Sequence, residues 1–274
     1  MSGFLGLSSL GTLASLLAFV GCVDFLTSRD NDIRESTQAI EKAQDDGQRA
    51  KAYSERGVAY SEKARYGRIT KQIPNDEYER LFDLAIKDHN QAVKLNPGNA
   101  EVYFNLAQAY YDRGGGDLVE NKEGKSWFDA AASNFEKAIE KDPRNSRAFD
   151  MLGLTYEQNS QPDKAIRAYT QEMAFDGRLG KLRLATAYCN IGFQHQQHQE
   201  LAAAAAAYQK STEFGIADDK SCPYDPFGNS VAIFTTETHE YDKAWEMVHR
   251  ALKMGHGVAP ELLLRLQKES GRTY

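Results

Sequence analysis

The chain has 274 residues, of which 41% are hydrophobic and 26% charged, and its formal net charge is −6. This composition excludes an intrinsically disordered chain and an integral membrane bundle. The acidic excess argues against nucleic acid as a general ligand, because phosphate binding needs clustered Lys and Arg. The length is long for one compact core but ordinary for stacked repeats.

The first segment, residues 2–23, carries no charge and is rich in Leu and Phe. Three interpretations remain open for it. A lipoprotein signal peptide would end just before Cys22, a signal anchor would stay as a membrane helix, and a buried helix would join the core. We favour the first, because Gly21 precedes Cys22 at the boundary where apolar sequence gives way to polar sequence. On this interpretation, residues 1–22 are a signal or anchor segment and Cys22 is lipidated.

The segment resembles the start of a bacterial lipoprotein, and Val23 rather than Asp follows Cys22. This resemblance implies an outer-membrane lipoprotein of the bacterial cell envelope that faces the periplasm, with an inner-membrane signal anchor as the alternative. Several acyl chains would hold such a protein firmly at a bilayer surface.

Residues 23–47 are predicted to form a tether followed by a capping helix. Asp24–Asn31 is the expected tether. Asp32–Gln44 has apolar residues at helical spacing and would cover one end of the fold. Asp45, Asp46 and Gly47 then form a stop signal, so the first full repeat is expected to begin near Gln48.

A repeated pattern of residue types begins here. Two segments have an aromatic residue, then Leu and a small residue, then Tyr: Tyr103, Leu106, Ala107 and Tyr110, and Phe149, Leu152, Gly153 and Tyr156. Two further segments match less closely: Tyr53, Arg56, Gly57 and Tyr60, and Tyr188, Ile191, Gly192 and His195. A second pattern recurs after the first-helix segments, with a small residue, a large one four later and, as a rule, a small one seven later. These slots hold Ala85, His89 and Ala92; Ala131, Phe135 and Ala138; Ala165, Tyr169 and Glu172; Ala204, Tyr208 and Ser211; and Ala244, Val248 and Ala251.

These patterns resemble the tetratricopeptide repeat, a pair of helices with a period of about 34 residues. The resemblance implies an all-α, right-handed superhelical solenoid of antiparallel helix pairs. It places about five repeats in residues 48–257. Small residues let two helices approach closely, and large ones fill the space beside them.

Two repeats are longer than the others. The extra residues fall near 61–76 and 114–125, between the two helices of each pair. The first insertion is apolar and predicts longer helices with a packed elbow. The second begins with Gly114, Gly115 and Gly116 and is charged, which predicts a mobile loop with Ser126 as the N-cap of the next helix.

The rest of the array is regular. Six consecutive alanines, Ala202–Ala207, indicate a helix because Ala is the best helix former. Residues 258–274 are predicted to be a C-terminal capping helix and tail that cover the last apolar face. Cys189 and Cys222 could pair in an oxidising compartment, although we favour a buried thiol and a loop thiol.

We find no motif that indicates catalysis, and the sequence predicts no cofactor and no enzyme. His195 and His198 stand three residues apart and could share a helix face, but no further ligands cluster near them. A metal-dependent enzyme that uses these two histidines is therefore only an alternative hypothesis.

The resemblance implies instead that first helices line a concave groove that binds a peptide or helix of a partner protein. The expected function is a membrane-tethered scaffold or adaptor in envelope or in secretion- or pilus-type assembly. The alternative is a structural protein, a homo-oligomer that stacks end to end. Some members of the family bind a C-terminal carboxylate with a clamp of five residues. Arg147 and Asn105 match only two of these five positions, so we do not expect a carboxylate clamp here. Outward positions of the first helices are the candidate site: Phe104, Asn105, Gln108, Tyr111, Asp112, Arg147, Asp150, Glu157, Asn190 and Phe193, with Ser54, Val58 and Leu154 beside them.

Overall fold

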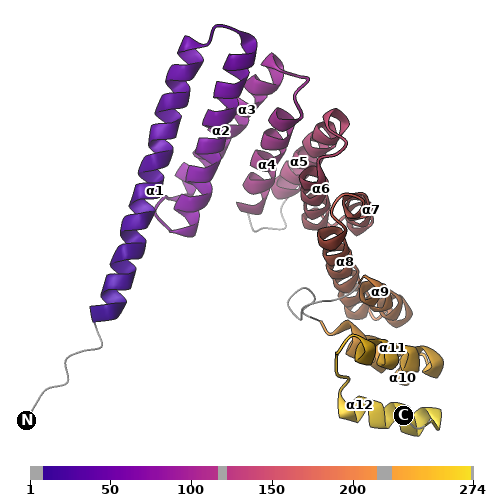
Figure 1. The fold of residues 1–274 in the computed structure, drawn as a ribbon. Helices are drawn as coiled ribbons and strands as arrows, with labels where there is room; N and C mark the ends of the chain where they lie inside the picture. The colour runs from indigo at the N-terminus through magenta and orange to yellow at the C-terminus, as the bar shows by residue number, and fades with distance from the viewer. Residues whose placement is uncertain (1–8, 117–121, 215–223, 273–274) are drawn as a thin grey trace, which may run out of the picture. The chain divides into compact units, whose positions relative to one another are not determined.

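The computed structural model describes residues 9–116, 122–214 and 224–272. All its regular elements within these ranges are α-helices, as the sequence predicted (Figure 1). In chain order they are α1 (Ser9–Lys42), α2 (Asp46–Ile69), α3 (Asn75–Leu95), α4 (Ala100–Gly116), α5 (Lys122–Lys141), α6 (Ser146–Gln158), α7 (Pro162–Met173), α8 (Gly177–Gln197), α9 (Leu201–Glu213), α10 (Pro226–Thr236), α11 (Tyr241–Lys253) and α12 (Pro260–Ser270).

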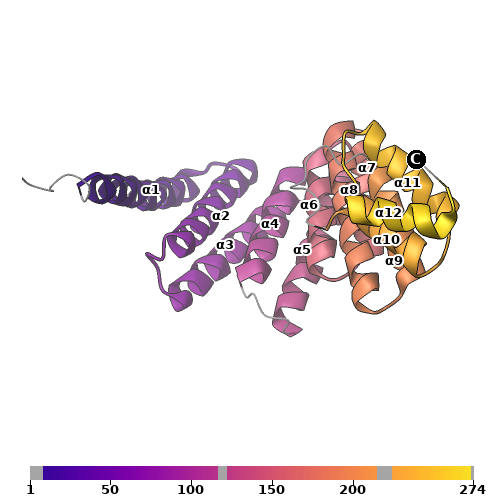
Figure 2. The same cartoon turned by 90° about the horizontal axis from the view of Figure 1, so that it is seen from below.

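The chain divides into two compact units, an N-terminal unit (Met1–Asn159) and a C-terminal unit (Ser160–Tyr274). Within the N-terminal unit each helix from α1 to α6 packs against the next one, and first helices α2, α4 and α6 also contact one another in order (Figures 1 and 2). Within the C-terminal unit the helices from α7 to α12 likewise pack in chain order. Hairpins that stack in sequence define a solenoid, which confirms the predicted fold class.

The repeat slots explain why these helices pack so closely. All fifteen slot residues of the second helices are buried, with at most 1% of their surface exposed. In the first repeat a Cβ atom on Gly57 would lie 2.7 Å from the His89 ring, and in the fourth one on Gly192 would lie 2.7 Å from the Tyr208 ring. In these two hairpins the small position of the first helix therefore meets the large position of the second, as the spacing predicted.

Local capping fixes where the helices begin. Asp45 accepts a hydrogen bond from the backbone N–H of Gln48 at the start of α2, and Asp176 accepts two at the start of α8. The turns inside three repeats contain a residue with left-handed backbone, and each stands five residues before the small slot of the second helix. These residues are Ser160, Gln199 and His239, with φ of 55°, 62° and 56°.

Helix α1 differs from the expected tether. Residues 24–31 are helical and belong to one helix of 34 residues that ends at Lys42. They pack on α2, since the rings of Phe25 and Tyr66 lie 4.2 Å apart and Lys63 forms an ion pair of 2.6 Å with Asp30. The tether prediction is wrong because these polar residues have partners on α2. No helix in the described ranges has a stretch long and apolar enough to cross a membrane.

The two insertions lengthen helices. The first repeat has the predicted packed elbow, in which Ile73 packs against a buried cluster that includes Tyr78 and Phe82. The prediction of a mobile loop over 114–125 is wrong at both ends: Gly114–Gly116 are in α4, and α5 begins at Lys122. Ser126 consequently lies inside α5 and does not cap it. A Cβ atom on Gly114 would stand 3.1 Å from the Phe128 ring, so a close helix approach accounts for this glycine.

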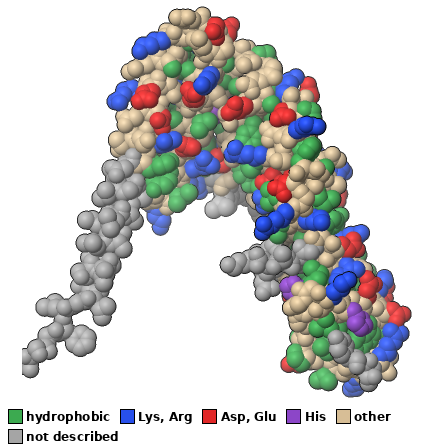
Figure 3. Space-filling view, in the orientation of Figure 1, with side chains coloured by type: hydrophobic (Ala, Val, Ile, Leu, Met, Phe, Trp, Pro, Cys, Tyr) green, Lys and Arg blue, Asp and Glu red, His purple; other side chains and the backbone are tan. Residues whose placement is uncertain are grey.

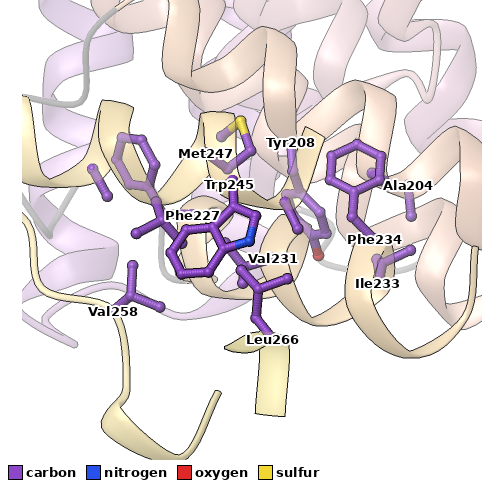
Figure 4. Packing of buried hydrophobic residues seen from close by; sticks show 14 of the residues in the cluster. Ala204, Tyr208, Phe227, Val231, Ile233, Phe234, Trp245, Met247, Val258 and Leu266 are labelled. Atoms are coloured by element: carbon purple, nitrogen blue, oxygen red, sulfur yellow. The ribbon is translucent and has the colours of Figure 1, made fainter. Parts of the chain in front are cut away.

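The C-terminal unit is built around one large apolar cluster (Figure 4). Phe227 and Val231 of α10 and Trp245 and Met247 of α11 meet there. Leu266 of α12 is fully buried against them, which confirms the predicted C-terminal capping helix. The alanine run lies within α9, also as predicted.

The cysteine prediction needs correction. Cys189 on α8 is completely buried, as expected, but it is disulfide-bonded, so the favoured free thiol is wrong for this residue. Cys222 lies outside the described residues. The backbone at Cys22 is part of α1.

Candidate functional site

The N-terminal unit has a groove of about 880 Å³ that runs between α1 and α4, with α2 as its floor. Residues at helical spacing line it on each side, which places one face of each helix toward the groove. The lining residues are Arg29, Asp32, Glu35, Ser36 and Ala39 of α1; Gly47, Ala50, Lys51, Ser54, Glu55, Val58 and Ala59 of α2; and Asn96, Asn99, Glu101, Val102 and Asn105 in and before α4.

A second cavity of about 350 Å³ adjoins it and shares Asn99, Glu101 and Asn105 with it. Arg147 of α6 lines this cavity, and its guanidinium carbon lies 4.7 Å from the centre of the Phe104 ring. The two cavities together form one recess over the first helices of three successive repeats.

Specific polar contacts hold the groove walls in place. Asn105 donates a side-chain hydrogen bond of 3.0 Å to the Ser54 hydroxyl, which joins α4 to α2. Arg29 forms an ion pair with Glu62, which joins α1 to α2. The walls are therefore preformed.

A buried ion pair supports the floor from behind. Arg56 donates to both carboxylate oxygens of Asp88, at 2.6 and 2.9 Å, and to the Thr37 hydroxyl at 3.1 Å. The Asp88 carboxylate raises the pKa of Arg56. This contact links α1, α2 and α3, so the groove floor cannot shift without breaking a buried pair.

Several predicted site residues do line this recess. Asn105 lies in both cavities, Phe104 and Arg147 lie in the smaller one, and Ser54 and Val58 lie in the larger one. Phe104 is only 6% exposed, because its ring packs edge-on against Phe135. It therefore supports the wall and offers little contact surface of its own.

The structure places other predicted residues elsewhere. Asp112 is turned inward, where Gln108 donates to it at 3.0 Å and Arg65 stands at 3.6 Å, and burial raises its pKa. Tyr111 packs edge-on against Phe128. Asp150 and Glu157 are half-buried outside both cavities.

The remaining two predicted residues, Asn190 and Phe193, belong to α8 of the C-terminal unit. The Phe193 ring stacks on Tyr224 with ring centres 3.9 Å apart. That contact occupies a face that we expected to be open to a partner.

Sequence reasoning missed the whole α1 wall. Arg29, Asp32, Ser36 and Ala39 recur every three to four residues, which is the signal of a helix face. Asp32, Ser36 and Ala39 belong to the predicted capping helix, which we expected to cover one end of the fold and not to line the groove. Arg29 belongs to the expected tether.

The histidines show no metal site. His195 Nδ1 lies 2.5 Å from a carboxylate oxygen of Glu200, and His198 is exposed at the end of α8. Across the described ranges, no three His, Cys, Asp or Glu side chains are grouped so that they could hold a metal ion.

The stacked hairpins and the groove are those of an all-α helical-repeat protein. Comparison with known proteins then gives the family. Residues 82–114 match a family model described as TPR repeat, and residues 134–167 match one described as tetratricopeptide repeat. With the repeat slots buried as the pattern requires, this chain contains tetratricopeptide repeats, which the two matched segments identify.

A curated relative agrees with this. Over 107 residues the chain is 31% identical to small glutamine-rich tetratricopeptide repeat-containing protein 2 of Saccharomyces cerevisiae. The matched region is 39% of this chain and 26% of the yeast protein, so the match spans about a quarter of the length of that relative.

Solved structures of low sequence identity also match. YrrB, a TPR protein described as having an unusual peptide-binding site, is 18% identical, with 86% of this chain and 97% of that chain covered and a TM-score of 0.43. BtubC from P. vanneervenii is 18% identical, with 87% and 94% covered and a TM-score of 0.44. The pilF protein of Pseudomonas aeruginosa is 15% identical, with 92% and 100% covered and a TM-score of 0.37.

Tetratricopeptide repeats are in general non-enzymatic modules that bind other proteins, and the two matched repeats support a protein-interaction scaffold.

Proposed function

We propose that the scaffold binds a peptide or helix of a partner protein in the groove between α1, α2 and α4. The observation that supports this most is the groove itself, whose volume is about 880 Å³ and whose lining, from α1, α2, α4 and the turn before α4, includes both polar and small apolar residues. Amide groups such as that of Asn99 can pair with a peptide backbone, and small side chains such as Ala50 leave room for it.

Preformed walls favour such binding. The α1–α2 ion pairs and the Asn105–Ser54 hydrogen bond exist before a partner arrives. Binding then spends little free energy on ordering the site, so modest contacts suffice for a useful affinity.

A steric substitution in the groove tests this proposal. Val58 is half-buried on the groove floor, and Val58→Trp should fill space that a peptide needs. With the full chain as bait in cell extract, we expect the captured partner to fall roughly tenfold, which corresponds to about 1.4 kcal/mol. Circular dichroism should show the same helix content as the original chain.

Leu264→Trp is the matched control, because Leu264 is 65% exposed on α12, far along the chain from the groove. Capture should be unchanged in this variant. Equal capture by the original chain and both variants would mean that the partner binds outside the groove.

We also propose that the N-terminus tethers the scaffold to a membrane of the bacterial envelope through lipidated Cys22, where it would serve secretion- or pilus-type assembly. The uncharged sequence before Cys22 supports this. So does the docking of α1 on α2 from Phe25 onward, since it would hold the groove close to the anchor.

The substitution Cys22→Ser tests the tether. We expect loss of labelled fatty acid from the protein and its release from the membrane fraction, because an unacylated chain has no thioether-linked lipid. Retention of the variant at the membrane with an uncleaved N-terminus would favour the signal anchor and reject lipidation.

A further inference from the structure

The groove carries an uneven set of charges. Its lining includes four carboxylates, from Asp32, Glu35, Glu55 and Glu101, and two cations, from Arg29 and Lys51. Acidic and basic side chains both occur over the N-terminal unit's visible face (Figure 3), and the whole chain has a net charge of −6. In the groove the carboxylates outnumber the cations two to one.

Both cations already have acidic partners. Arg29 forms ion pairs with Asp32 at 2.9 Å and with Glu62, and its guanidinium carbon lies 5.0 Å from the centre of the Phe25 ring. Lys51 lies 3.7 Å from Glu55. Neither cation is positioned to neutralise the rest of the groove.

Glu35 and Glu101 are the carboxylates that remain. Within the described residues neither has a basic side chain in ion-pair range, and both are exposed to the groove. They stand on opposite walls, Glu35 on α1 and Glu101 on α4. A chain laid along the α2 floor would therefore pass between two unneutralised negative charges.

The floor between them suits the stem of a long basic side chain. Val58 is half-buried on it, and the buried Ala50 and Ala59 add no bulk to it, with the Ser54–Asn105 hydrogen bond alongside. Lys and Arg place their methylene groups on such surface and keep the charged end at the polar rim.

We infer that the groove selects a basic segment of its partner protein, whose Lys or Arg side chains pair with Glu35 and Glu101 while their stems lie on the α2 floor. This inference rests on the proposed groove function and adds the chemistry of the occupant. An acidic segment would place like charges side by side at both walls, which opposes its binding.

Fluorescence anisotropy with three labelled peptides of equal length tests the inference: one alternates Lys with Ala, one Gln with Ala, and one Glu with Ala. The full chain should bind the Lys peptide at least roughly tenfold more tightly than the Gln peptide, and the Glu peptide most weakly. The double variant Glu35→Gln/Glu101→Gln should lose most of the preference for the Lys peptide.

The control variant Asp83→Asn/Glu140→Gln removes the same number of charges. Asp83 on α3 and Glu140 on α5 are exposed and line neither cavity. This control variant should bind the Lys peptide as tightly as the original chain does. Equal weakening by both double variants would reveal a general charge effect and overturn the inference.

Two further outcomes separate the inference from the proposed function. Preference for the Gln or Glu peptide, abolished by Val58→Trp, would overturn the basic partner and leave the groove function standing. A second outcome has the same meaning: the chain binds none of the three peptides but captures a cellular partner, and Val58→Trp abolishes this capture. The basic partner would then be overturned and the groove function would stand. Capture that Val58→Trp leaves unchanged would reject the groove function itself.

Discussion

In the N-terminal unit, the large residue beside the glycine of the first helix is His89, whereas in the C-terminal unit the same slot holds Tyr208. Gly57 and Gly192 face these rings in the same way, since a Cβ atom on either would lie 2.7 Å from the ring. In these two repeats the slot therefore holds a flat ring that fills the space beside the glycine, and the ring need not be apolar.

The surroundings of the two slots differ in chemistry. Next to His89, Asp88 is 4% exposed and holds Arg56 in a two-bonded ion pair that also reaches Thr37 of α1. Around Tyr208, the C-terminal unit has its large apolar cluster. In the N-terminal unit a buried ion pair thus adds to the apolar packing beside this slot, whereas in the C-terminal unit the slot lies in the apolar cluster.

The largest effect that would test this difference is expected from Asp88→Ala. It leaves Arg56 without its acidic partner in a largely buried place, so the N-terminal unit should lose about 4 kcal/mol of unfolding free energy. Hydrogen exchange measured on peptides of α2 and α3 during urea unfolding reports this unit separately from the other.

Arg56→Met/Asp88→Leu is the matched control, because it replaces both partners with apolar side chains of similar size. We expect it to recover most of the lost stability. If Asp88→Ala alone changes stability by less than about 0.5 kcal/mol, the ion pair does not hold the unit together.

The next effect is a pH dependence of the N-terminal unit. Burial lowers the pKa of His89 from 6.5 to about 4 in the folded chain. Its folded-state pKa is depressed, so the unfolded chain takes up a proton first as the pH falls below 6.5. The contribution of neutral His89 to the free energy of unfolding is fully present above pH 6.5 and is lost as the pH falls toward 4. The total loss is about 3 kcal/mol.

Carboxylates titrate near the lower end of this range, so a control must isolate the histidine. His89→Phe places in this slot the residue that occupies it in the second repeat, Phe135. The difference in stability between pH 7 and pH 4.5, measured by urea unfolding, should shrink in this variant. An unchanged difference would assign the pH dependence to other groups.

The repeat slots show how much of the fold the sequence could predict. Spacing alone identified fifteen residues that are all buried, because helix periodicity and close packing constrain each of them strongly. It failed for Gly114–Gly116 and for Ser126, where local turn preferences suggested a loop. There the contact of Gly114 with Phe128 favours a longer helix, and a contact distant in sequence cannot be read from local preference.

The site was only partly predictable for a related reason. An outward position on an isolated helix was predicted for Asp112 and Phe193, yet Arg65 and Tyr224 cover them from neighbouring elements. Conversely, the helix over residues 32–44 was predicted, but its packing against α2, which makes one of its faces a groove wall, was not. The residues that line a groove are thus decided by tertiary contacts between helices. The buried repeat positions, in contrast, can be predicted from the spacing of residues along the sequence.

The smallest effect returns to the glycine beside each ring, now in the C-terminal unit. Gly192→Ala adds a methyl group 2.7 Å from the buried Tyr208 ring, and the overpacking should outweigh the gain in helix propensity by about 1 kcal/mol. Gly177→Ala, in the same helix but with no atom within 4 Å of the new methyl group, is the matched control and should not destabilise the unit. Thermal melting of both variants measures the difference. If the two melt alike, the Tyr208 ring can move aside, and the close contact between small and large slots is not what limits how near α8 and α9 approach.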